Sequence, residues 1–477
     1  MSPIIGSLAD ASAKGFGFFS IGGSYYISTF TDGNAAASQS SQINAVITDS
    51  AKNVYVTANY KPTAGGGNGI IAKIDPSGAI LWQRNLADTN SSGSQSYYAG
   101  GITLDSSNNV YAVGTFNNTS AGRNSEIVKY NSSGTIQWQR KLVGAATAAN
   151  QQDWVFSCFT DSSANLYVAG YSRNSSSAPQ GAFEKYDTNG TIQWQRTFYG
   201  GATAGNRNDQ WAAISGDSSG NSYLAGSARN ASNAPIAYLA KYNSGGAIQW
   251  QRSITDPGGG AGHFAYANGS VIDSSSNVYT GGQGYNSSGG YESWIAKYNS
   301  SGVIQWQRAI DNGGSAAATY AQVYSIGIDS SANIYVGGGY KNSSAGYPGF
   351  VLKYNSSGTI QWQRSIADGN TAVNQSDTIA GITTDVSGDL YITGQIKNTS
   401  GGYNGILMKV PADGSKTGTY TVGTGQTIVY SASSLVDSAG VETDAAGTAT
   451  DAIGVVTDSA GVMVDSANTT TYTKAGI

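Results

Sequence analysis

The chain has 477 residues, and only 11 % of them are charged, against about 25 % in typical soluble proteins. Its formal net charge of −4 argues against a nucleic-acid-binding protein. One cysteine, Cys158, cannot form an internal disulfide, and a single histidine leaves no Cys/His cluster for zinc, so neither a metal nor a cofactor is expected.

The N-terminal region contains no basic segment followed by an apolar stretch, and no apolar run approaches the roughly 20 residues of a membrane span. The sequence therefore predicts neither Sec export nor a membrane-spanning segment. The first predicted β-strand lies within residues 22–28, around Tyr26.

Internal repeats of 56 residues follow this strand. Tryptophan recurs at that step inside Gly-x-Ile-x-Trp-Gln-Arg, at Trp82, Trp138, Trp194, Trp250, Trp306 and Trp362. Three further columns hold seven members each: tyrosines from Tyr55 to Tyr391, aspartates from Asp49 to Asp385, and lysines from Lys73 to Lys409. Seven units are therefore present, and stepping back 56 residues from Trp82 leads to Tyr26. A fixed period of this length indicates one supersecondary unit that is repeated along the chain.

Each unit divides into four short β segments, which we call strands A to D. In the second unit they are residues 101–104, 110–113, 126–130 and 135–140, separated by Gly, Asn, Asp and Ser clusters. This pattern predicts an all-β fold, a seven-bladed β-propeller with four-stranded blades. Blade seven lacks strand D, and the N-terminal strand around Tyr26 is expected to supply it. A β-solenoid is the main alternative, but it would not need a strand from the opposite terminus.

Several repeated columns are interpreted as scaffold. The strand D tryptophans should pack between neighbouring blades, and the Asn/Asp-x-x-Gly turns place glycine where the backbone needs a positive φ. Asp105 and Lys129 represent columns expected to pair at the tight turns, with sevenfold metal or sugar sites as the alternative. The arginine of Trp-Gln-Arg is expected to order the D-to-A loops.

The C-terminal tail has a second and shorter period. After a β-like segment at 419–430, aspartate recurs every seven residues from Asp437 to Asp465, with a glycine three positions after each of the first four. Glycine in every period excludes a coiled coil, and calcium-binding repeats of the RTX kind use nine-residue steps. We expect short β turns that a partner surface orders. The predicted organisation is an attachment segment (1–21), a propeller (22–415) and a β-rich tail (416–477), with the tail as a candidate contact for a homo-oligomer.

Two resemblances follow from these motifs. The pattern Asp-Ser-Ser-x-Asn-x-Tyr-Val followed by Lys-Tyr-Asn-Ser-Ser-Gly-x-Ile-x-Trp-Gln-Arg resembles the SBBP-type β-propeller repeat over roughly residues 22–414. The opening at 11–17 and 23–28 and the small-residue tail are similar to structural proteins of marine and cyanobacterial tailed phages. The second resemblance implies a virion protein, assembled in the host cytoplasm and exposed on the particle surface, with other virion proteins as partners. Neither resemblance supplies a catalytic motif.

Candidate binding residues lie where the repeat varies. Both tight turns of a blade fall at one end, so the variable D-to-A and B-to-C connections share the other end, which we call the loop face. The candidates before strand A are Tyr98, Asp153, Trp154, Asp209, Trp211, His263 and Tyr266, and those of the B-to-C loops are Lys61, Arg173, Arg229, Lys341 and Lys397. Aromatic rings beside polar groups suit carbohydrate. The alternative is that the rings only pack loops and the cations are solvated.

The function predicted from these observations is a non-enzymatic virion structural protein, an exposed tail or fibre adhesin that recognises host-surface polysaccharide. A polysaccharide hydrolase or lyase of a phage tail is one alternative, with Asp153, Asp209 and Asp377 as its candidate acids, because paired aspartates suffice for glycosidases. A head-decoration protein without a ligand is another.

Overall fold

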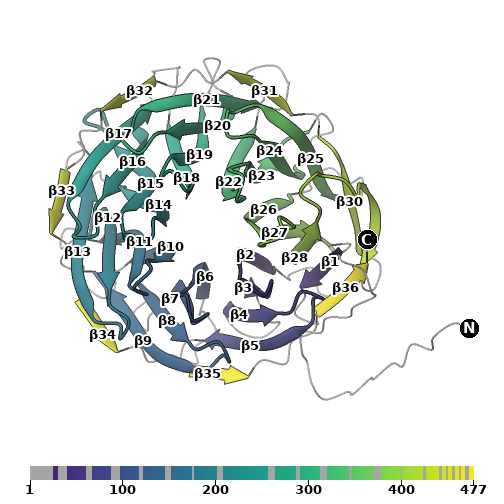
Figure 1. Ribbon diagram of the computed structural model, residues 1–477, viewed down its shortest axis with the longest axis horizontal. Coiled ribbons are helices and arrows are strands. Elements are labelled where there is room, and N and C mark those ends of the chain that lie inside the picture. The colour runs from purple at the N-terminus through teal and green to yellow at the C-terminus, as the bar shows by residue number, and fades with distance from the viewer. Residues whose placement is uncertain are drawn as a thin grey trace, which may run out of the picture.

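A computed structural model describes residues 25–30, 40–60, 67–87, 97–117, 122–144, 152–173, 177–200, 208–255, 264–285, 290–311, 320–342, 346–369, 376–398, 400–422, 426–433, 435–439, 443–446, 450–453, 457–460, 464–467 and 472–476. These residues form strands and turns and no helix, in seven antiparallel sheets arranged in a ring around a common axis (Figure 1). The predicted seven-bladed β-propeller is confirmed.

Strands A to D of the first six blades follow the chain. Blade one holds β2 (Gln42–Thr48), β3 (Val54–Tyr60), β4 (Asn68–Ile74) and β5 (Ile80–Ala87); blade two holds β6 (Tyr97–Leu104), β7 (Val110–Asn117), β8 (Arg123–Tyr130) and β9 (Ile136–Val143); and blade three holds β10 (Trp154–Thr160), β11 (Leu166–Arg173), β12 (Pro179–Tyr186) and β13 (Ile192–Tyr199). Blade four holds β14 (Gln210–Gly216), β15 (Ser222–Arg229), β16 (Pro235–Tyr242) and β17 (Ile248–Thr255); blade five holds β18 (Ala265–Ile272), β19 (Val278–Tyr285), β20 (Tyr291–Tyr298) and β21 (Ile304–Asp311); and blade six holds β22 (Ala321–Ile328), β23 (Ile334–Tyr340), β24 (Gly349–Tyr354) and β25 (Ile360–Asp368).

Blade seven joins the two ends of the chain. Its strands A to C are β26 (Thr378–Thr384), β27 (Leu390–Lys397) and β28 (Tyr403–Val410), and its fourth strand is β1 (Tyr26–Phe30), which pairs antiparallel with β28. Every residue of β1 is buried, and Tyr26 and Ile27 have no exposed surface. The prediction that the N-terminal strand completes blade seven is confirmed.

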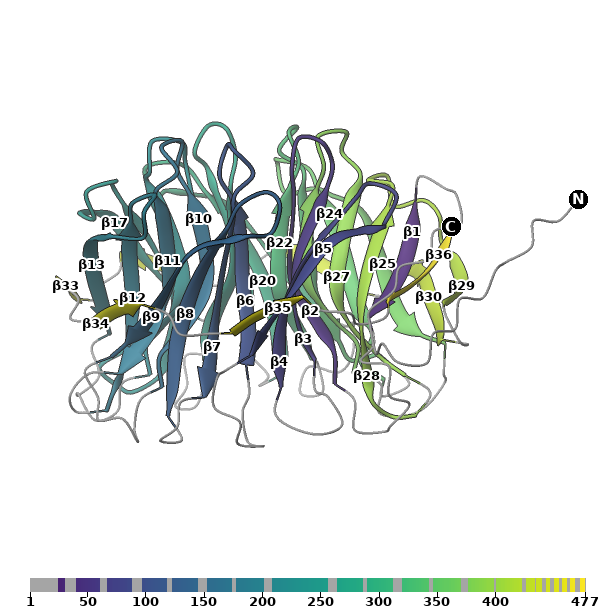
Figure 2. The same cartoon turned by 90° about the horizontal axis from the view of Figure 1, so that it is seen from below.

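The C-terminal tail adds a further strand to the outside of every blade. After β29 (Gly418–Val422), the tail strands are β30 (Gln426–Ala432), β31 (Val436–Ala439), β32 (Thr443–Ala446), β33 (Thr450–Ile453), β34 (Thr457–Ala460), β35 (Val464–Ala467) and β36 (Tyr472–Gly476). They pair in turn with blades six, five, four, three, two, one and seven. Figures 1 and 2 show these strands around the outer rim of the ring. We call β30–β36 the belt.

The register of the belt is the same at every blade. Ala432 lies opposite Arg364, Ala439 opposite Arg308, and Lys474 opposite Ser28. Each step of seven residues along the belt thus matches a step of 56 residues back along the propeller, and the intermediate blades keep this rule. The seven-residue period of the tail therefore corresponds to the step from one blade of the ring to the next.

This arrangement differs from the expectation that a partner surface orders the tail. Strand D is the outermost strand of a four-stranded blade, and its free edge offers unpaired backbone groups to another strand. Seven extended residues span at most about 25 Å, and this reach suffices to carry the tail from one such edge to the next. The domain boundaries and the homo-oligomer contact remain predictions.

Neighbouring blades are joined through the Trp-Gln-Arg segment. Trp82 Nε1 donates a hydrogen bond to Ser132 O of the next blade at 3.1 Å, and Arg84 Nε donates to Gly134 O at 2.7 Å. Gly134 has a φ of 78°, and a Cβ there would lie 2.7 Å from the Trp82 ring. The same contacts recur at Trp138, Trp194, Trp250 and Trp362. The packing of tryptophan between blades is confirmed, although the rings are half-buried. The arginine Nε binds the next C/D turn, and the expected ordering of the D-to-A loops concerns residues that lie largely outside the described part of the chain, so it stays a prediction.

The aspartate and lysine columns are joined through tyrosine. Asp105 accepts hydrogen bonds from the amides of its own A/B turn and from Tyr111 Oη at 3.2 Å. Lys129 Nζ lies 4.9 Å from the centre of the Tyr111 ring and 3.9 Å from Asp105 Oδ2. A lysine lies over the equivalent tyrosine in all seven blades. Ion pairing with the aspartate is confirmed in blade two and, through Lys409, in blade seven.

Candidate functional site

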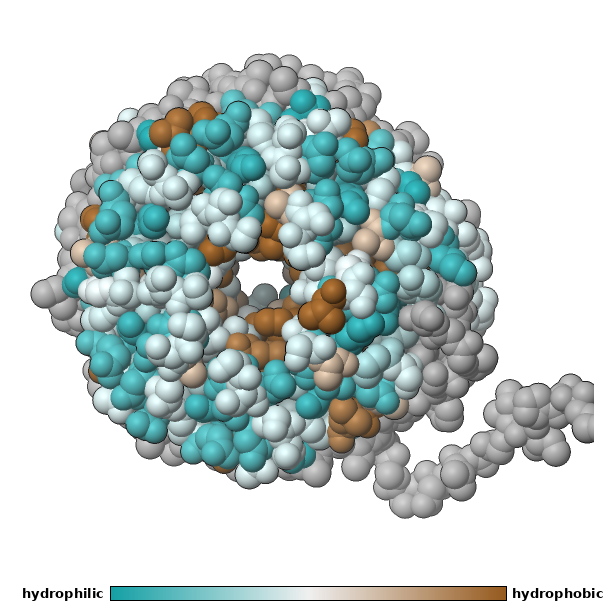
Figure 3. All heavy atoms as spheres, in the orientation of Figure 1, coloured by the Kyte–Doolittle hydropathy of each residue, from teal (hydrophilic) through white to brown (hydrophobic). Residues whose placement is uncertain are grey.

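The innermost strands of the blades enclose a cavity in the central channel. Its volume is 580 Å³, and it is visible as a hollow at the centre of the ring (Figure 3). Strand A of every blade contributes to the lining, together with Gln395 of β27. The lining consists of glycine, small apolar residues, hydroxyls, amides and three aromatic rings, and none of these lining side chains is an acid, lysine, arginine or histidine. The cavity therefore suits an uncharged polar ligand.

A β-bulge at the same position in all seven A strands shapes this cavity. The pairing of strands A and B skips one residue in six blades and two residues in blade two. Bulges re-aim side chains next to binding sites. The bulged residues are Asn44, Gly100 with Gly101, Phe156, Ala212, Asn268, Tyr324 and Ala380, and every one of them lines the cavity.

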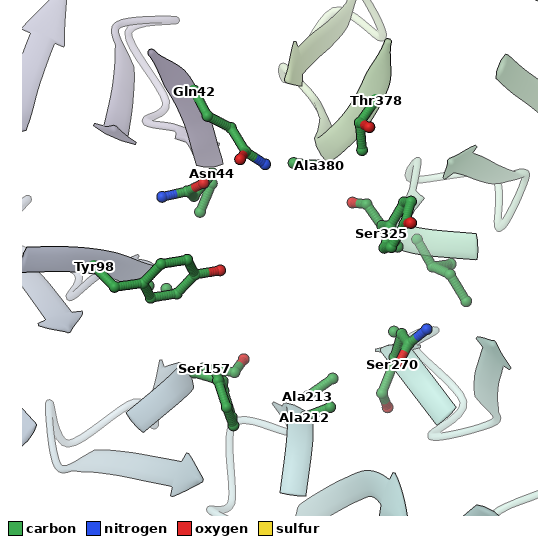
Figure 4. A pocket seen from close by; sticks show the side chains of 18 of the residues that line it. Gln42, Asn44, Tyr98, Ser157, Ala212, Ala213, Ser270, Ser325, Thr378 and Ala380 are labelled. Carbon is green, nitrogen blue, oxygen red and sulfur yellow. The ribbon is translucent and has the colours of Figure 1, made fainter. Parts of the chain in front are cut away.

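The two asparagines among the bulged residues donate hydrogen bonds to backbone oxygens of the next blade. Asn44 Nδ2 donates to Ala99 O at 2.6 Å, and Asn268 Nδ2 donates to Val323 O at 2.9 Å. These bonds hold the two side chains in place beside the cavity. The Tyr98 ring extends into the same space, with its hydroxyl toward the centre (Figure 4).

Beside the cavity, the structure brings the predicted residues Tyr98 and Trp154 into contact. Their ring centres lie 5.4 Å apart, and Trp154 also stacks on Phe156 at 5.6 Å. Tyr171 lies 6.5 Å from Trp154, and the Arg123 guanidinium lies 4.7 Å above the indole. The result is a cluster of four rings and one cation, which reaches the cavity through Tyr98 and Phe156. Phe156 and Arg123 are additions to the predicted set.

The three predicted aspartates bind backbone amides. Asp153 accepts from Gly144 N at 2.6 Å and Arg173 N at 3.1 Å. Asp209 and Asp377 make the equivalent bonds in blades four and seven. Each carboxylate therefore ties the start of strand A to the end of strand B and to the residue at the end of the preceding strand D. All three are buried, and none of them lines the cavity.

Of the remaining predicted residues, Arg173 lies beside the Tyr98 cluster, because it acts electrostatically on Tyr171 and donates a hydrogen bond to Gln152 Oε1 at 3.0 Å. The others lie apart from the cluster. Trp211 is fully buried, with its ring 4.2 Å from Phe198, so it belongs to the core of blades three and four. Tyr266 packs against Phe264 in blade five. The cations Arg173, Arg229, Lys341 and Lys397 lie at or just after the ends of strand B in four different blades. His263 and Lys61 lie outside the described residues.

The buried aspartates predict a pH dependence of stability. Burial raises the pKa of the Asp377 carboxyl to about 7 and that of Asp153 to about 6. These values lie above the roughly 3.9 of an unfolded chain, so the folded state binds more protons. The associated stability is present below about pH 4 and is lost as the pH rises through about 7. We expect the free energy of unfolding of the Asp377→Asn variant, from urea titrations, to fall less steeply over that range than wild type.

Asp413 provides the matched control for this prediction. A hydrogen bond from Ser415 lowers the pKa of this exposed carboxyl. The contribution of Asp413 to the free energy of unfolding is therefore constant above about pH 5. Asp413→Asn should leave the pH dependence of this free energy above that pH unchanged. If the free energy of unfolding fell equally steeply with pH in the wild type and in Asp377→Asn, the raised pKa of Asp377 would be contradicted.

No metal cluster and no membrane-spanning helix are found within the described parts of the chain. Groups of three or more His, Cys, Asp or Glu side chains able to hold a metal ion are absent there, as are long apolar helices.

Comparison with known proteins returns structural neighbours only. No family model and no curated protein matches the chain. Solved neighbours include a Trypanosoma rangeli sialidase in complex with the inhibitor DANA (9 % identity, 78 % of this chain and 55 % of that one, TM-score 0.41) and Drosophila semaphorin 1a extracellular domains 1-2 (8 %, 80 % and 87 %, 0.45). A glucose dehydrogenase covers 69 % of this chain and 99 % of its own at 10 % identity, with a TM-score of 0.37.

These likenesses concern the fold alone. The chain spans 55 % of the length of the sialidase. The SBBP-type repeat and the phage resemblance remain predictions.

Proposed function

We propose that this protein is a non-enzymatic adhesin, exposed on a phage particle, that binds a host-surface glycan at the loop-face mouth of the central channel. The observation that carries the glycan assignment is the channel itself, whose described lining combines hydroxyls, amides and aromatic rings with no charged side chain. Rings cover the apolar faces of sugars, and amides and hydroxyls bind their hydroxyl groups.

The Tyr98 cluster supports the same ligand class. Tyr98 and Phe156 line the cavity, and both rings pack against Trp154. The Arg123 guanidinium lies over the Trp154 ring. The presence of Tyr98 in the lining gives a sugar ring an aromatic face with a hydroxyl at its edge.

The carboxylates favour binding over hydrolysis. A glycosidase of the common kind places two carboxyl groups on either side of the scissile bond. The candidate acids Asp153, Asp209 and Asp377 instead accept backbone hydrogen bonds and are buried outside the cavity lining. The placement in a virion is supported by the sequence resemblance of residues 11–17, residues 23–28 and the small-residue tail to phage structural proteins.

The proposal predicts that Tyr98→Ala weakens glycan binding about tenfold or more, a loss of about 1.4 kcal/mol. A printed array of bacterial and algal polysaccharides, followed by calorimetry on the best hit, measures the effect. Tyr98→Phe keeps the ring and should retain most of the affinity. New reducing or unsaturated ends after incubation with the polysaccharide would show that the protein is a degrading enzyme and not an adhesin. Unchanged glycan binding by Tyr98→Ala would contradict the assignment of the binding site to the channel.

Electron microscopy of intact particles with a specific antibody tests the virion location.

A further inference from the structure

A second group of aromatic side chains lies on the loop-face side of blades five and six. It consists of Tyr266, Phe264, Tyr285, Tyr291, Tyr320 and Tyr347, which we call the aromatic strip. Phe264 lies 4.9 Å from Tyr266 and 4.6 Å from Tyr285. Tyr291 lies 4.8 Å from Tyr285 and 5.6 Å from Tyr320, and Tyr347 follows at 5.4 Å from Tyr320. The strip is continuous across two blades, and each ring is partly exposed.

The propeller scaffold does not require these rings. Phe264 and Tyr320 occupy one repeat position, and Tyr291 and Tyr347 occupy another. The first position holds Ser40, Ser96, Gln152, Asn208 and Ser376 in the other blades, and the second holds Gly67, Arg123, Pro179, Pro235 and Tyr403. Blades five and six alone have aromatic residues at both positions. Since the other blades close without them, the rings serve something other than blade formation.

The strip is connected to the wall of the central channel. Tyr320 Oη donates a hydrogen bond to Gln322 Oε1 at 2.6 Å, and Tyr324 Oη donates to the same oxygen. Tyr324 is one of the bulged residues that line the cavity. A ligand that leaves the channel mouth over blade six therefore meets the strip next.

The charges beside the strip have both signs. The carboxylate Glu292 follows Tyr291 and lies near Asp311. Lys341 donates its backbone amide to Tyr320 O at 2.8 Å, so a cation adjoins the other side. No single-sign field covers the strip to attract an acidic or a basic polymer. Partly exposed rings with phenol hydroxyls, lying next to each other, match the alternating faces and hydroxyls of consecutive sugar units.

We propose that the aromatic strip is an extension of the channel site and binds consecutive units of an uncharged polysaccharide whose end or branch enters the channel. This inference rests on the proposed glycan-binding function and adds the ligand class, a neutral polymer rather than a short or acidic glycan. Each exposed aromatic–sugar contact is of the order that aromatic pairing supplies, about 0.5–1.5 kcal/mol, so loss of two rings should weaken binding of the polymer about tenfold.

The experiment compares polymers with short fragments. Dextran, mixed-linkage β-glucan and galactomannan, each intact and as its tetrasaccharide, are titrated against the wild type, Tyr98→Ala and the double variant Tyr291→Ala/Tyr347→Ala, which leaves the hydrogen bond of Tyr320 to Gln322 in place. The double variant should weaken binding of an intact polymer about tenfold and leave its tetrasaccharide unaffected. Tyr98→Ala should weaken both. An acidic polysaccharide such as alginate should bind more weakly than the neutral polymers.

Tyr403→Ala is the matched control, because Tyr403 occupies the repeat position of Tyr291 in blade seven, outside the strip. It should bind every probe as the wild type does. Should the double variant unfold, the single variant Tyr347→Ala at the outer end of the strip replaces it. Unchanged polymer affinity in the strip variants, with the Tyr98→Ala loss intact, would overturn the strip alone. Failure of the wild type to bind any neutral polymer would overturn the strip, and binding of another glycan through Tyr98 would still leave the proposed function standing.

Discussion

A chain that lacks residues 1–30 is expected to lose the folded ring. Strand β1 is the fourth strand of blade seven, and it lies between β28 and the last belt strand, β36. Its side chains Tyr26, Ile27 and Phe30 are buried. Burial of side chains of this size contributes about 1.5–3 kcal/mol each, and the sum is comparable to the roughly 5–15 kcal/mol that stabilises a typical folded domain. Circular dichroism melting and gel filtration of the truncated chain measure the effect.

A point variant in the same strand keeps this prediction testable if the truncated chain aggregates. Ile27→Ala should lower the free energy of unfolding by about 2–5 kcal/mol. Leu81 is the matched control, since 53 % of its surface is exposed, and Leu81→Ala should change stability by no more than about 0.5 kcal/mol. A truncated chain that elutes as a compact monomer and melts at the wild-type temperature would refute closure by β1.

Ending the chain at Ser433 is expected to expose the outer edges of six blades. The belt strands β31–β36 would be lost, while β30 would still cover blade six. Backbone amides at the outer edges of β1, β5, β9, β13, β17 and β21 should then exchange with solvent at least tenfold faster, because their hydrogen-bond partners are gone. Hydrogen exchange followed by mass spectrometry measures this change. Unpaired edges also promote association between molecules, so light scattering should detect larger species.

The common register of the belt allows a sharper version of this test. One residue inserted after Ala446 leaves β31 and β32 in place and shifts every later belt strand by one position, which turns its side chains to the opposite face. Blades four and five should then keep wild-type protection, whereas blades three, two, one and seven should lose it. Equal protection in all blades would show that the seven-residue step is not needed for belt pairing.

Part of the candidate site follows from the repeat itself. Residues that break a regular column at the start of strand A stand out in the sequence, and Tyr98 and Trp154 do meet at the channel. The bulged column with Phe156 and Tyr324 was missed. A bulge is a shift in the pairing of two strands, so the sequence of one strand alone does not reveal it. The sequence shows only a variable residue two positions after the column of Tyr98. Asp153 looks like a catalytic acid in the sequence because the same carboxylate serves as an acid or as an acceptor for backbone amides.

The 56-residue period, with strand and turn residues in each copy, determined the number of blades, their four strands and the borrowed strand β1, because these features depend on local preference and on counting. Tertiary structure decided where the tail goes. Four-residue segments such as Val464–Ala467 are too short to specify a partner, and the strand edges that they pair with lie several hundred residues earlier in the chain. The seven-residue step acquires a meaning only when the blades stand in a ring whose spacing it matches.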